Sequence, residues 1–233
     1  MGTGIFFLAR SVWPAILSIH MRYRTALFDL DGTLIDHFAA IHRSHAYTMK
    51  QLGLPVPTLA QVRAAVGGGL EQAITRLAGP QNVTVALAIY RPYWEATMLD
   101  DVQLLPGARE LLTRLKAGGI QSAVFTNKHG PSSRRVCAHL GIADLLDGNF
   151  GATDTAWLKP TREFTDYVMN ALHAATASTA MIGDSPYDFA AAQNAGLEFY
   201  GVTTGTHHAA ELQSAGARNV YSNLAALTPL LLA

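Results

Sequence analysis

The chain has 233 residues, is 49% hydrophobic and carries a formal net charge of +0. This length and composition allow a sizeable core in one or two domains. Because the sequence has no excess of basic residues and no basic stripe, nucleic acid is not an expected partner.

The single cysteine, Cys137, limits the cysteine-based sites that the chain can form. One thiol cannot form an internal disulfide. Cys137 also lies in a helical-looking stretch without a second thiol, so neither a redox pair nor a zinc site is indicated. We therefore expect a protein of the reducing cytoplasm.

The amino-terminal stretch Gly4–Ile19 is apolar but is interrupted by Arg10 and Pro14, so it is too short and too broken for a membrane-spanning helix. It also lacks the basic start and the small-residue cleavage site of a secretory signal. We therefore expect no integral membrane segment. We expect residues 1–20 to be an extension outside the fold, with Met21 as the natural start, and a peripheral membrane anchor is the alternative.

The first regular element in chain order is a buried strand over Thr25–Leu30. A block with helical spacing follows it, and Gly67-Gly68-Gly69 and Gly79-Pro80 interrupt that block. The helices predicted there are Phe38–Leu52, Thr58–Val66, Leu70–Leu77 and Val83–Leu99. Since no strand pattern occurs between them, we predict that residues 37–103 form an all-helical cap domain inserted after the first strand.

From residue 104 onward, strand-like runs alternate with helical stretches. The predicted strands are Ile120–Phe125, a short one around Phe150, Thr179–Ile182, Phe199–Val202 and Asn219–Tyr221. The predicted helices are Ala108–Lys116, Pro131–Leu140, Arg162–Ala174, Pro186–Ala195, Ala209–Ala215 and Leu224–Leu232. This alternation predicts an α/β fold in which a Rossmann-like parallel sheet has helices on both faces. Residues 21–36 and 104–233 would form this core.

Two acids, Asp29 and Asp31, stand where the first predicted strand ends. Residues two apart in an extended strand point to the same face, so the two carboxylates would project together, and Gly32 allows a sharp turn after them. Carboxylates this close repel each other unless a positive charge lies between them or one keeps its proton. The pair therefore suits a divalent cation together with a nucleophile and a proton donor, although an Asp-rich turn is the plain alternative.

Polar residues also follow two later strands, and ligands bind at the carboxyl ends of the strands in open parallel sheets. Thr126-Asn127 follows one strand and Gly183-Asp184-Ser185 follows another, with Asp188 four residues after Asp184 and Lys159 in a loop between the two groups. Four acids, one lysine and one hydroxyl at one sheet edge suggest phosphoryl transfer with Mg²⁺. Lys159 would stabilise charge on the transferred oxygens, and Thr126 would donate a hydrogen bond to them.

Four motifs in this order resemble those of the haloacid dehalogenase superfamily: DLDGTLID, TN, KP and GDSPYD. The helical block just after the first motif is similar to the subclass with a helical cap. The stretches LLPGARELLTRLKAGGI, TNKHG and GVTTGTHHAAELQSAGARNV look most like phosphoglycolate phosphatases, which often have a lysine at the place of Lys128.

The resemblance implies a role for each matching residue. Asp29 would attack phosphorus and form an aspartyl phosphate, while Asp31 would protonate the leaving alkoxide and then activate water. Thr126, the backbone of Asn127 and Lys159 would hold the phosphoryl group. The implied Mg²⁺ ligands are Asp29, the backbone carbonyl of Asp31, Asp184 and Asp188, the last one either near the ion or acting through water. The helical block would be a lid that excludes bulk water from a small phosphorylated metabolite.

The cap residues leave alternatives open. Backbone amides at Gly68 and Gly69 could approach a substrate anion, as in the phosphatase substrate loop, or the glycines could be a plain helix break. Arg63 and Arg76 flank this loop and could meet the same anion. His42 and His45 on the first cap helix could hold a sugar phosphate, as in a β-phosphoglucomutase-like mutase, but we favour the polar outer face of the helix for both.

The acid at Asp31 favours phosphate esters over halides, because a halide leaving group needs no proton. The sequence therefore predicts a Mg²⁺-dependent phosphatase with phosphoglycolate as the first candidate substrate. A phosphosugar mutase and a non-catalytic binding protein on the same fold are the alternatives. The sequence leaves the choice between monomer and homodimer open.

Overall fold

The computed structural model describes residues 22–232. The predicted extension over residues 1–20 and the predicted start at Met21 lie outside the described residues. Among the residues described, no helix is both long enough and apolar enough to cross a membrane.

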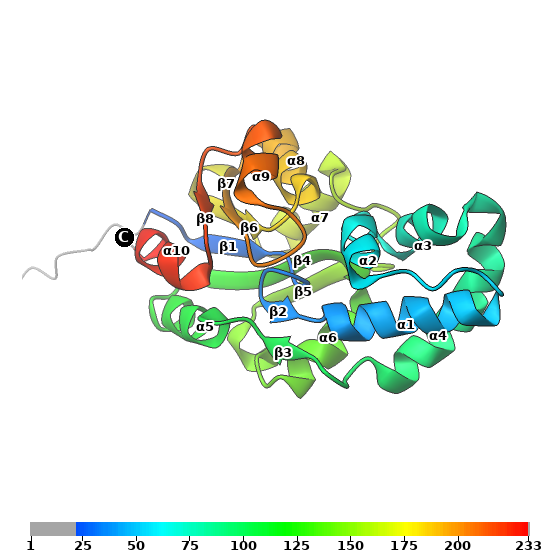
Figure 1. Ribbon diagram of the computed structural model, residues 1–233. Helices are drawn as coiled ribbons and strands as arrows, with labels where there is room; N and C mark the ends of the chain where they lie inside the picture. The colour runs from blue at the N-terminus through cyan, green and yellow to red at the C-terminus, as the bar shows by residue number, and fades with distance from the viewer. Residues whose placement is uncertain (1–21, 233) are drawn as a thin grey trace, which may run out of the picture.

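A parallel sheet forms the centre of the described chain (Figure 1). Its six strands lie in the order β5-β4-β1-β6-β7-β8, so β1 is central between β4 and β6. Their bounds are β1 Thr25–Phe28, β4 Gln121–His129, β5 Gly148–Ala152, β6 Thr179–Gly183, β7 Glu198–Val202 and β8 Val220–Tyr221. The register pairs Leu27 of β1 with Ala123 of β4 and with Met181 of β6.

Helices cover both faces of this sheet, and alternation along β1 explains why both faces are apolar. Ala26 and Phe28 pack in one buried cluster with α5, α6 and α10, and Leu27 packs in a second cluster with α7, α8 and α9. These helices span α5 Ala108–Ala117, α6 Gly130–His139, α7 Arg162–Ala171, α8 Pro186–Ala195, α9 Ala209–Ser214 and α10 Leu224–Leu231. The predicted α/β fold with helices on both faces is confirmed.

Four further helices form a separate layer, called here the α1–α4 bundle, beyond the carboxyl ends of the strands (Figure 1). They are α1 Phe38–Gln51, α2 Leu59–Ala65, α3 Leu70–Ala78 and α4 Val83–Thr97. Phe38, Met49, Ile74 and Trp94 contribute to a buried apolar cluster of their own. The 3₁₀ helices of the described chain are η1 Pro80–Asn82, η2 Ala143–Leu145 and η3 Thr176–Ser178.

A short antiparallel ribbon joins the bundle to the sheet. Its strands, β2 (Ile35–Asp36) and β3 (Gln103–Leu104), pair where the chain leaves the sheet region and where it returns. The sequence did not predict this ribbon, because two-residue strands carry too few side chains for a periodic pattern.

Two strand ends differ from the prediction. β1 ends at Phe28 and not at Leu30, because the chain turns at Asp29–Gly32. β4 continues from Gln121 to His129, so Thr126 and Asn127 lie within the strand and not after it. A register shift against β5 between Phe125 and His129 marks this irregular end. Both differences change a strand boundary by only a few residues. Asp29, Thr126 and Asn127 stay at the predicted edge of the sheet.

Candidate functional site

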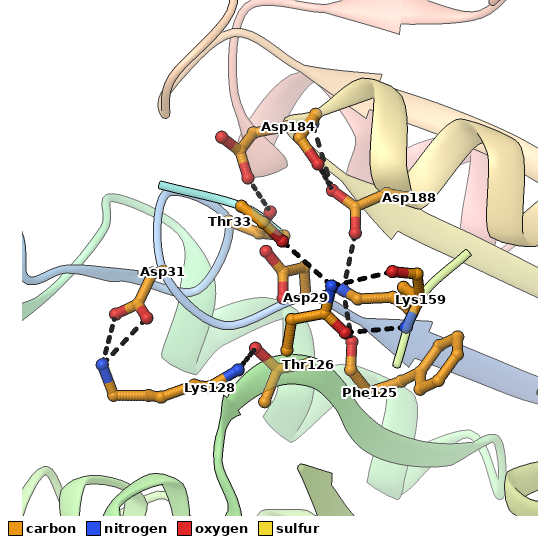
Figure 2. Close-up of polar contacts among 12 residues, drawn as sticks. Asp29, Asp31, Thr33, Phe125, Thr126, Lys128, Lys159, Asp184 and Asp188 are labelled. Carbon is orange, nitrogen blue, oxygen red and sulfur yellow. Dashed lines mark hydrogen bonds and ion pairs between the residues drawn. The ribbon is translucent and has the colours of Figure 1, made fainter. Parts of the chain in front are cut away.

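The carboxyl ends of β1, β4 and β6 are neighbours in the sheet, and the predicted motif residues gather there (Figure 2). Asp29 follows β1 directly, and its backbone N–H donates to the carbonyl of Ile182 in β6 at 2.9 Å. Asp184 follows β6, and Thr126 lies near the end of β4. The parallel register therefore brings together residues that are far apart in the sequence.

Lys159 lies at the centre of this group and is 3% exposed. Its Nζ donates to Asp29 Oδ1 at 2.9 Å, to Asp188 Oδ1 at 2.6 Å and to the carbonyl of Phe125 at 2.8 Å. Burial alone would lower the pKa of Lys159, but Asp188 and Asp29 raise it above its usual value. Lys159 is therefore a buried cation and not a solvated loop lysine.

Asp188 and Asp184 hold different parts of the site. Asp188 Oδ2 accepts from the Ser185 backbone N–H at 3.0 Å and from the Ser185 hydroxyl at 2.7 Å, which caps α8. Asp184 Oδ2 accepts from the backbone N–H and hydroxyl of Thr206 at 2.7 and 3.0 Å, and Oδ1 accepts from the Thr33 hydroxyl at 3.3 Å. Hydrogen bonds thus orient both carboxylates.

These acids form a group that could hold a cation. Carboxylate oxygens of Asp29, Asp184 and Asp188 lie within 4.8 Å of one another. Burial, with repulsion from Asp188 and Asp29, raises the pKa of Asp184 to about 8, and burial raises the pKa of Asp29 to about 6 despite Lys159. Two buried carboxylates and a partly exposed one, with one lysine, leave negative charge in excess, and hard oxygen donors of this kind fit Mg²⁺.

Asp31 points away from this group toward Lys128 (Figure 2). Lys128 Nζ contacts both of its carboxylate oxygens, at 2.8 and 3.1 Å, and His37 Nδ1 lies 3.4 Å from Oδ1. Burial alone would raise the pKa of Asp31, but Lys128 and His37 lower it well below its usual value. The structure thus shows Asp31 in an ion pair, a state in which it holds no proton to donate.

Thr126 and Asn127 are placed beside the acids, but the side chain of Asn127 has a structural task. Its Nδ2 donates to the carbonyls of Gly67 and Lys159 at 3.0 Å each, and its Oδ1 accepts from the Lys159 backbone N–H at 2.7 Å. Asn127 therefore ties the lysine loop to the glycine loop. The amide group of its side chain is therefore occupied by hydrogen bonds within the protein.

The three glycines between α2 and α3 border a cavity of about 630 Å³ between the α1–α4 bundle and the sheet edge. Gly67 and Gly69 have φ values of 114° and 92°, which residues with a Cβ rarely adopt. A Cβ at Gly68 would lie 1.7 Å from Gln72 Oε1. The loop thus borders the cavity in a backbone conformation that favours glycine, and its contact with substrate stays a prediction.

Asp29, Asp31, Thr126 and Asp184 lie at the sheet side of this cavity. The bundle side includes Ile41, His45, Tyr90 and Trp94, and the loop after β5 adds Trp157 and Leu158. The cavity thus joins the predicted motif residues to a mainly apolar wall.

The prediction for His45 was wrong. It is buried, 1% exposed, packs its ring against Tyr90 with centroids 4.8 Å apart, and borders the cavity. By contrast, His42 lies away from the cavity and contacts the carbonyl of Pro57 at 2.9 Å. Its position on α1 agrees with the expected polar face.

The two arginines beside the glycine loop are not among the cavity residues. Arg63 lies over the Phe38 ring and donates to the carbonyl of Gly205 at 3.3 Å. Arg76 donates to the carbonyl of Ala65 at 3.2 Å and to the Tyr187 hydroxyl at 3.0 Å. Both arginines fasten the loop region instead of reaching the acids.

Sequence reasoning missed several residues that orient the acids: Thr33, His37, Gly205 and Thr206. A Cβ on Gly205 would lie 1.9 Å from Asp184 Oδ2, so only glycine fits there. The GTH run after β7 contains a Gly-Thr pair, but its approach to Asp184 depends on the sheet order and has no local signal. His37 lies directly after the first motif and could have been considered from its position.

Comparison with known proteins places this geometry in a family. The haloacid dehalogenase-like hydrolase family matches residues 26–202, which is more than half of the chain. A probable phosphatase, IndB, from Dickeya dadantii is 33% identical over 195 residues, covering 81% of this chain and 85% of that protein. A phosphoglycolate phosphatase from Yersinia pseudotuberculosis is 28% identical, covering 88% of this chain and 92% of its own.

The fold leads to the same family. The structure of a haloacid dehalogenase-like hydrolase from Streptococcus pneumoniae has a TM-score of 0.81 and 25% identity, with 90% of this chain and 99% of that chain covered. The family resemblance and the prediction of a hydrolase are confirmed. With its motif residues gathered at one sheet edge, the chain belongs to the haloacid dehalogenase-like hydrolase family.

Proposed function

We propose that this hydrolase is a Mg²⁺-dependent phosphatase that cleaves a phosphomonoester through an aspartyl-phosphate intermediate. The observation that carries the proposal is the group formed by the partly exposed Asp29 and the buried Asp184 and Asp188 near the buried Lys159. A carboxylate nucleophile, a lysine and a candidate cation site in one place suit attack on an anionic phosphate. The relatives named phosphatases agree with a hydrolase of phosphoric monoesters.

In the first step, an oxygen of Asp29 forms a bond to phosphorus while the bond to the ester oxygen breaks. Lys159 holds an Asp29 oxygen by its ammonium group, which orients the carboxylate for attack. Thr126 and the backbone of Asn127 bind the phosphoryl oxygens. These contacts become more valuable as charge moves onto the oxygens in the transition state.

Asp31 moves the protons. It gives one to the leaving alkoxide, and in the second step it takes one from the water that attacks phosphorus. The second attack breaks the bond between phosphorus and Asp29 and releases inorganic phosphate. Because Lys128 pairs with Asp31 in the structure, that ion pair must open before Asp31 can bind a proton.

Asp29, the backbone carbonyl of Asp31 and Asp184 would hold Mg²⁺, with Asp188 near it. When bound, the ion reduces the repulsion between the carboxylates and the phosphate. Asp188 already accepts from Lys159 and Ser185, so we propose that its main task is to hold the lysine.

We propose that residues 37–103, which include the α1–α4 bundle, act as a cap domain over a core of residues 21–36 and 104–233. The glycine loop, including Gly68 and Gly69, would contact the substrate as the cap closes. The substrate is a phosphorylated metabolite, and the sequence resemblance alone makes phosphoglycolate the first candidate. We place the enzyme in the cytoplasm because its single thiol, Cys137, is buried and has no partner thiol in the sequence.

Phosphate release with Mg²⁺ and with chelator tests the proposal. Asp29→Asn should lower release at least about 10³-fold, because the nucleophile is lost. The control is Asp166→Asn, which changes an exposed acid paired with Arg162. A phosphorylated Asp29 detected by mass spectrometry after rapid quenching would support the intermediate, whereas full activity of Asp29→Asn would refute it.

Isomerisation of β-glucose 1-phosphate without net phosphate release would instead identify a mutase. No turnover of any phosphate ester, with Mg²⁺ still bound, would favour a binding protein. These outcomes separate the alternatives that the sequence left open.

A further inference from the structure

We propose that the alcohol released from the substrate carries a ring and is about as large as a nucleoside. This inference rests on the proposed phosphatase function and assigns a task to the cavity wall beyond the motif residues. The substrate class is a phosphate monoester of a ring-bearing alcohol, for which nucleoside 5′-monophosphates are suitable probes.

The volume of the cavity is the first observation. At about 630 Å³ it lies within the range of about 300–1,000 Å³ typical of sites for ligands of drug size. A two-carbon alcohol on the phosphate would leave most of this space to water. A ligand that fills the cavity would displace that water and gain contact with the walls.

The chemistry of the walls is the second observation. The bundle contributes Ile41, Tyr90 and Trp94, and the loop after β5 contributes Trp157 and Leu158. Trp157 is 43% exposed although it is a large aromatic residue. The Thr155 hydroxyl accepts from the backbone N–H of Trp157 and donates to its carbonyl, at 3.1 Å each. These contacts hold the backbone of Trp157 in the loop. An exposed indole that borders an apolar cavity offers a face on which a ring can stack.

The charges around the cavity disfavour a substrate that carries a second small anionic group, such as a carboxylate, close to its phosphate. Lys128 is paired with Asp31. Of the two glutamates that border the cavity, Glu95 is paired with Arg135, and Glu71 makes no salt bridge within the described chain. Arg91 also borders it, but this residue is exposed and faces a second hollow on the outer side of α4 as well. A carboxylate close to the phosphate would therefore meet Asp31, Glu71 and an already paired lysine.

His45 places an uncharged imidazole ring in this apolar wall. It is 1% exposed and makes no hydrogen bond to any residue of the described chain, and its Nδ1 is fully buried without a partner. Burial lowers the pKa of His45 to about 4, so the ring is neutral near pH 7. The ring therefore belongs to the uncharged part of the cavity wall and brings no cation that could hold a second anion.

Turnover of matched esters by the full chain with Mg²⁺ tests the inference. Ribose 5-phosphate has the phosphate and sugar of a nucleoside 5′-monophosphate but lacks the base, and phosphoglycolate has neither ring. We expect kcat/KM for the best nucleoside monophosphate to exceed that for both by at least about ten-fold. Equal or faster turnover of ribose 5-phosphate or phosphoglycolate would overturn the inference and leave the phosphatase proposal intact.

Two variants locate the contact. Trp157→Ala should raise KM for the nucleotide by about ten-fold while raising that for ribose 5-phosphate much less, because only the nucleotide has a ring to stack. Tyr167→Ala is the control, since Tyr167 is an exposed aromatic residue that packs on Phe150 outside the cavity. Equal effects of Trp157→Ala on both substrates would contradict the assigned contact.

Calorimetry on Asp29→Asn separates this inference from the proposed reaction. Suppose that the unaltered chain hydrolyses no ester, but Asp29→Asn binds the nucleotide more tightly than ribose 5-phosphate. The phosphatase proposal then fails and the cavity inference stands. If the two bind equally, the cavity inference fails whatever the turnover.

Discussion

Replacing Lys159 with methionine should test the electrostatic balance of the site most directly. The substitution keeps the length and apolar stem of the side chain but removes an ammonium group that binds Asp29, Asp188 and the carbonyl of Phe125. Removing one partner of a buried ion pair costs about 3–5 kcal/mol, because the remaining charge stays buried without compensation. We expect the free energy of unfolding in chelator to fall by about that amount.

Urea unfolding of Lys159→Met at pH 8 measures this loss, with and without Mg²⁺. The control Lys50→Met removes an exposed lysine in the last turn of α1 and should cost no more than about 1 kcal/mol. Mg²⁺ should recover part of the stability of Lys159→Met, because it restores a positive charge among the acids. A loss below about 1 kcal/mol in chelator would refute the reasoning, since the carboxylates would then not depend on the lysine for their charge balance.

Three further predictions concern the groups around this lysine. Because burial raises the pKa of Asp184 to about 8, above the value of about 4 in the unfolded chain, the contribution of Asp184 to stability in chelator should be greatest below pH 4. This contribution should fall as the pH rises to 8. Urea titrations should show that Mg²⁺ or Asp184→Asn reduces this slope, and an unchanged slope would contradict it. Lys128→Met should shift the basic limb of the profile of kcat against pH to higher pH, because Lys128 keeps the pKa of Asp31 low. Lys128→Arg keeps the positive charge and should leave this limb in place. Gly205→Ala should weaken Mg²⁺ binding at least about ten-fold by calorimetry, because its Cβ would displace Asp184, and unchanged affinity would show that Asp184 does not bind the ion.

The sheet and the position of its acids could be predicted because both depend on short-range patterns. β1 and β6 are apolar runs that end directly before Asp29 and Asp184, and strands of this kind lie in the interior of parallel sheets. Once both strands are parallel neighbours, their carboxyl ends must meet. The strand pattern thus predicted that Asp29 and Asp184 share one sheet edge, whereas their direct approach depends on β6 lying beside β1.

The residues that orient the acids could not be predicted in the same way. Thr206 reaches Asp184 only because β7 lies beside β6, and Asn127 holds Lys159 only because two loops meet above β4. These contacts depend on the sheet order and on exact loop paths, and neither leaves a periodic signal. The resemblance supplied the motif residues but not these supporting contacts.

His45 shows a different kind of error, in which residue type outweighed position. Phe38, Ile41, His45 and Met49 are spaced three or four apart on α1, so they share one face of the helix. That face is buried in the structure. The spacing therefore predicted a buried histidine, whereas the general preference of histidine for the surface suggested the opposite.

The contacts of Lys128 connect the proton-transfer residue with the α1–α4 bundle. Its ammonium group pairs with Asp31 and lies 4.6 Å from the centre of the Trp94 ring on α4. Trp94 in turn donates from its indole N–H to the Ser132 hydroxyl of α6 at 3.2 Å. Because an ammonium group is held both by the carboxylate and by the ring face, a shift of α4 against the sheet must change the pairing of Asp31. In the proposed mechanism, closure of the α1–α4 bundle over a substrate would thus act on Asp31 through Lys128. It would also act through His37, whose ring packs against Trp94 and lies beside Asp31.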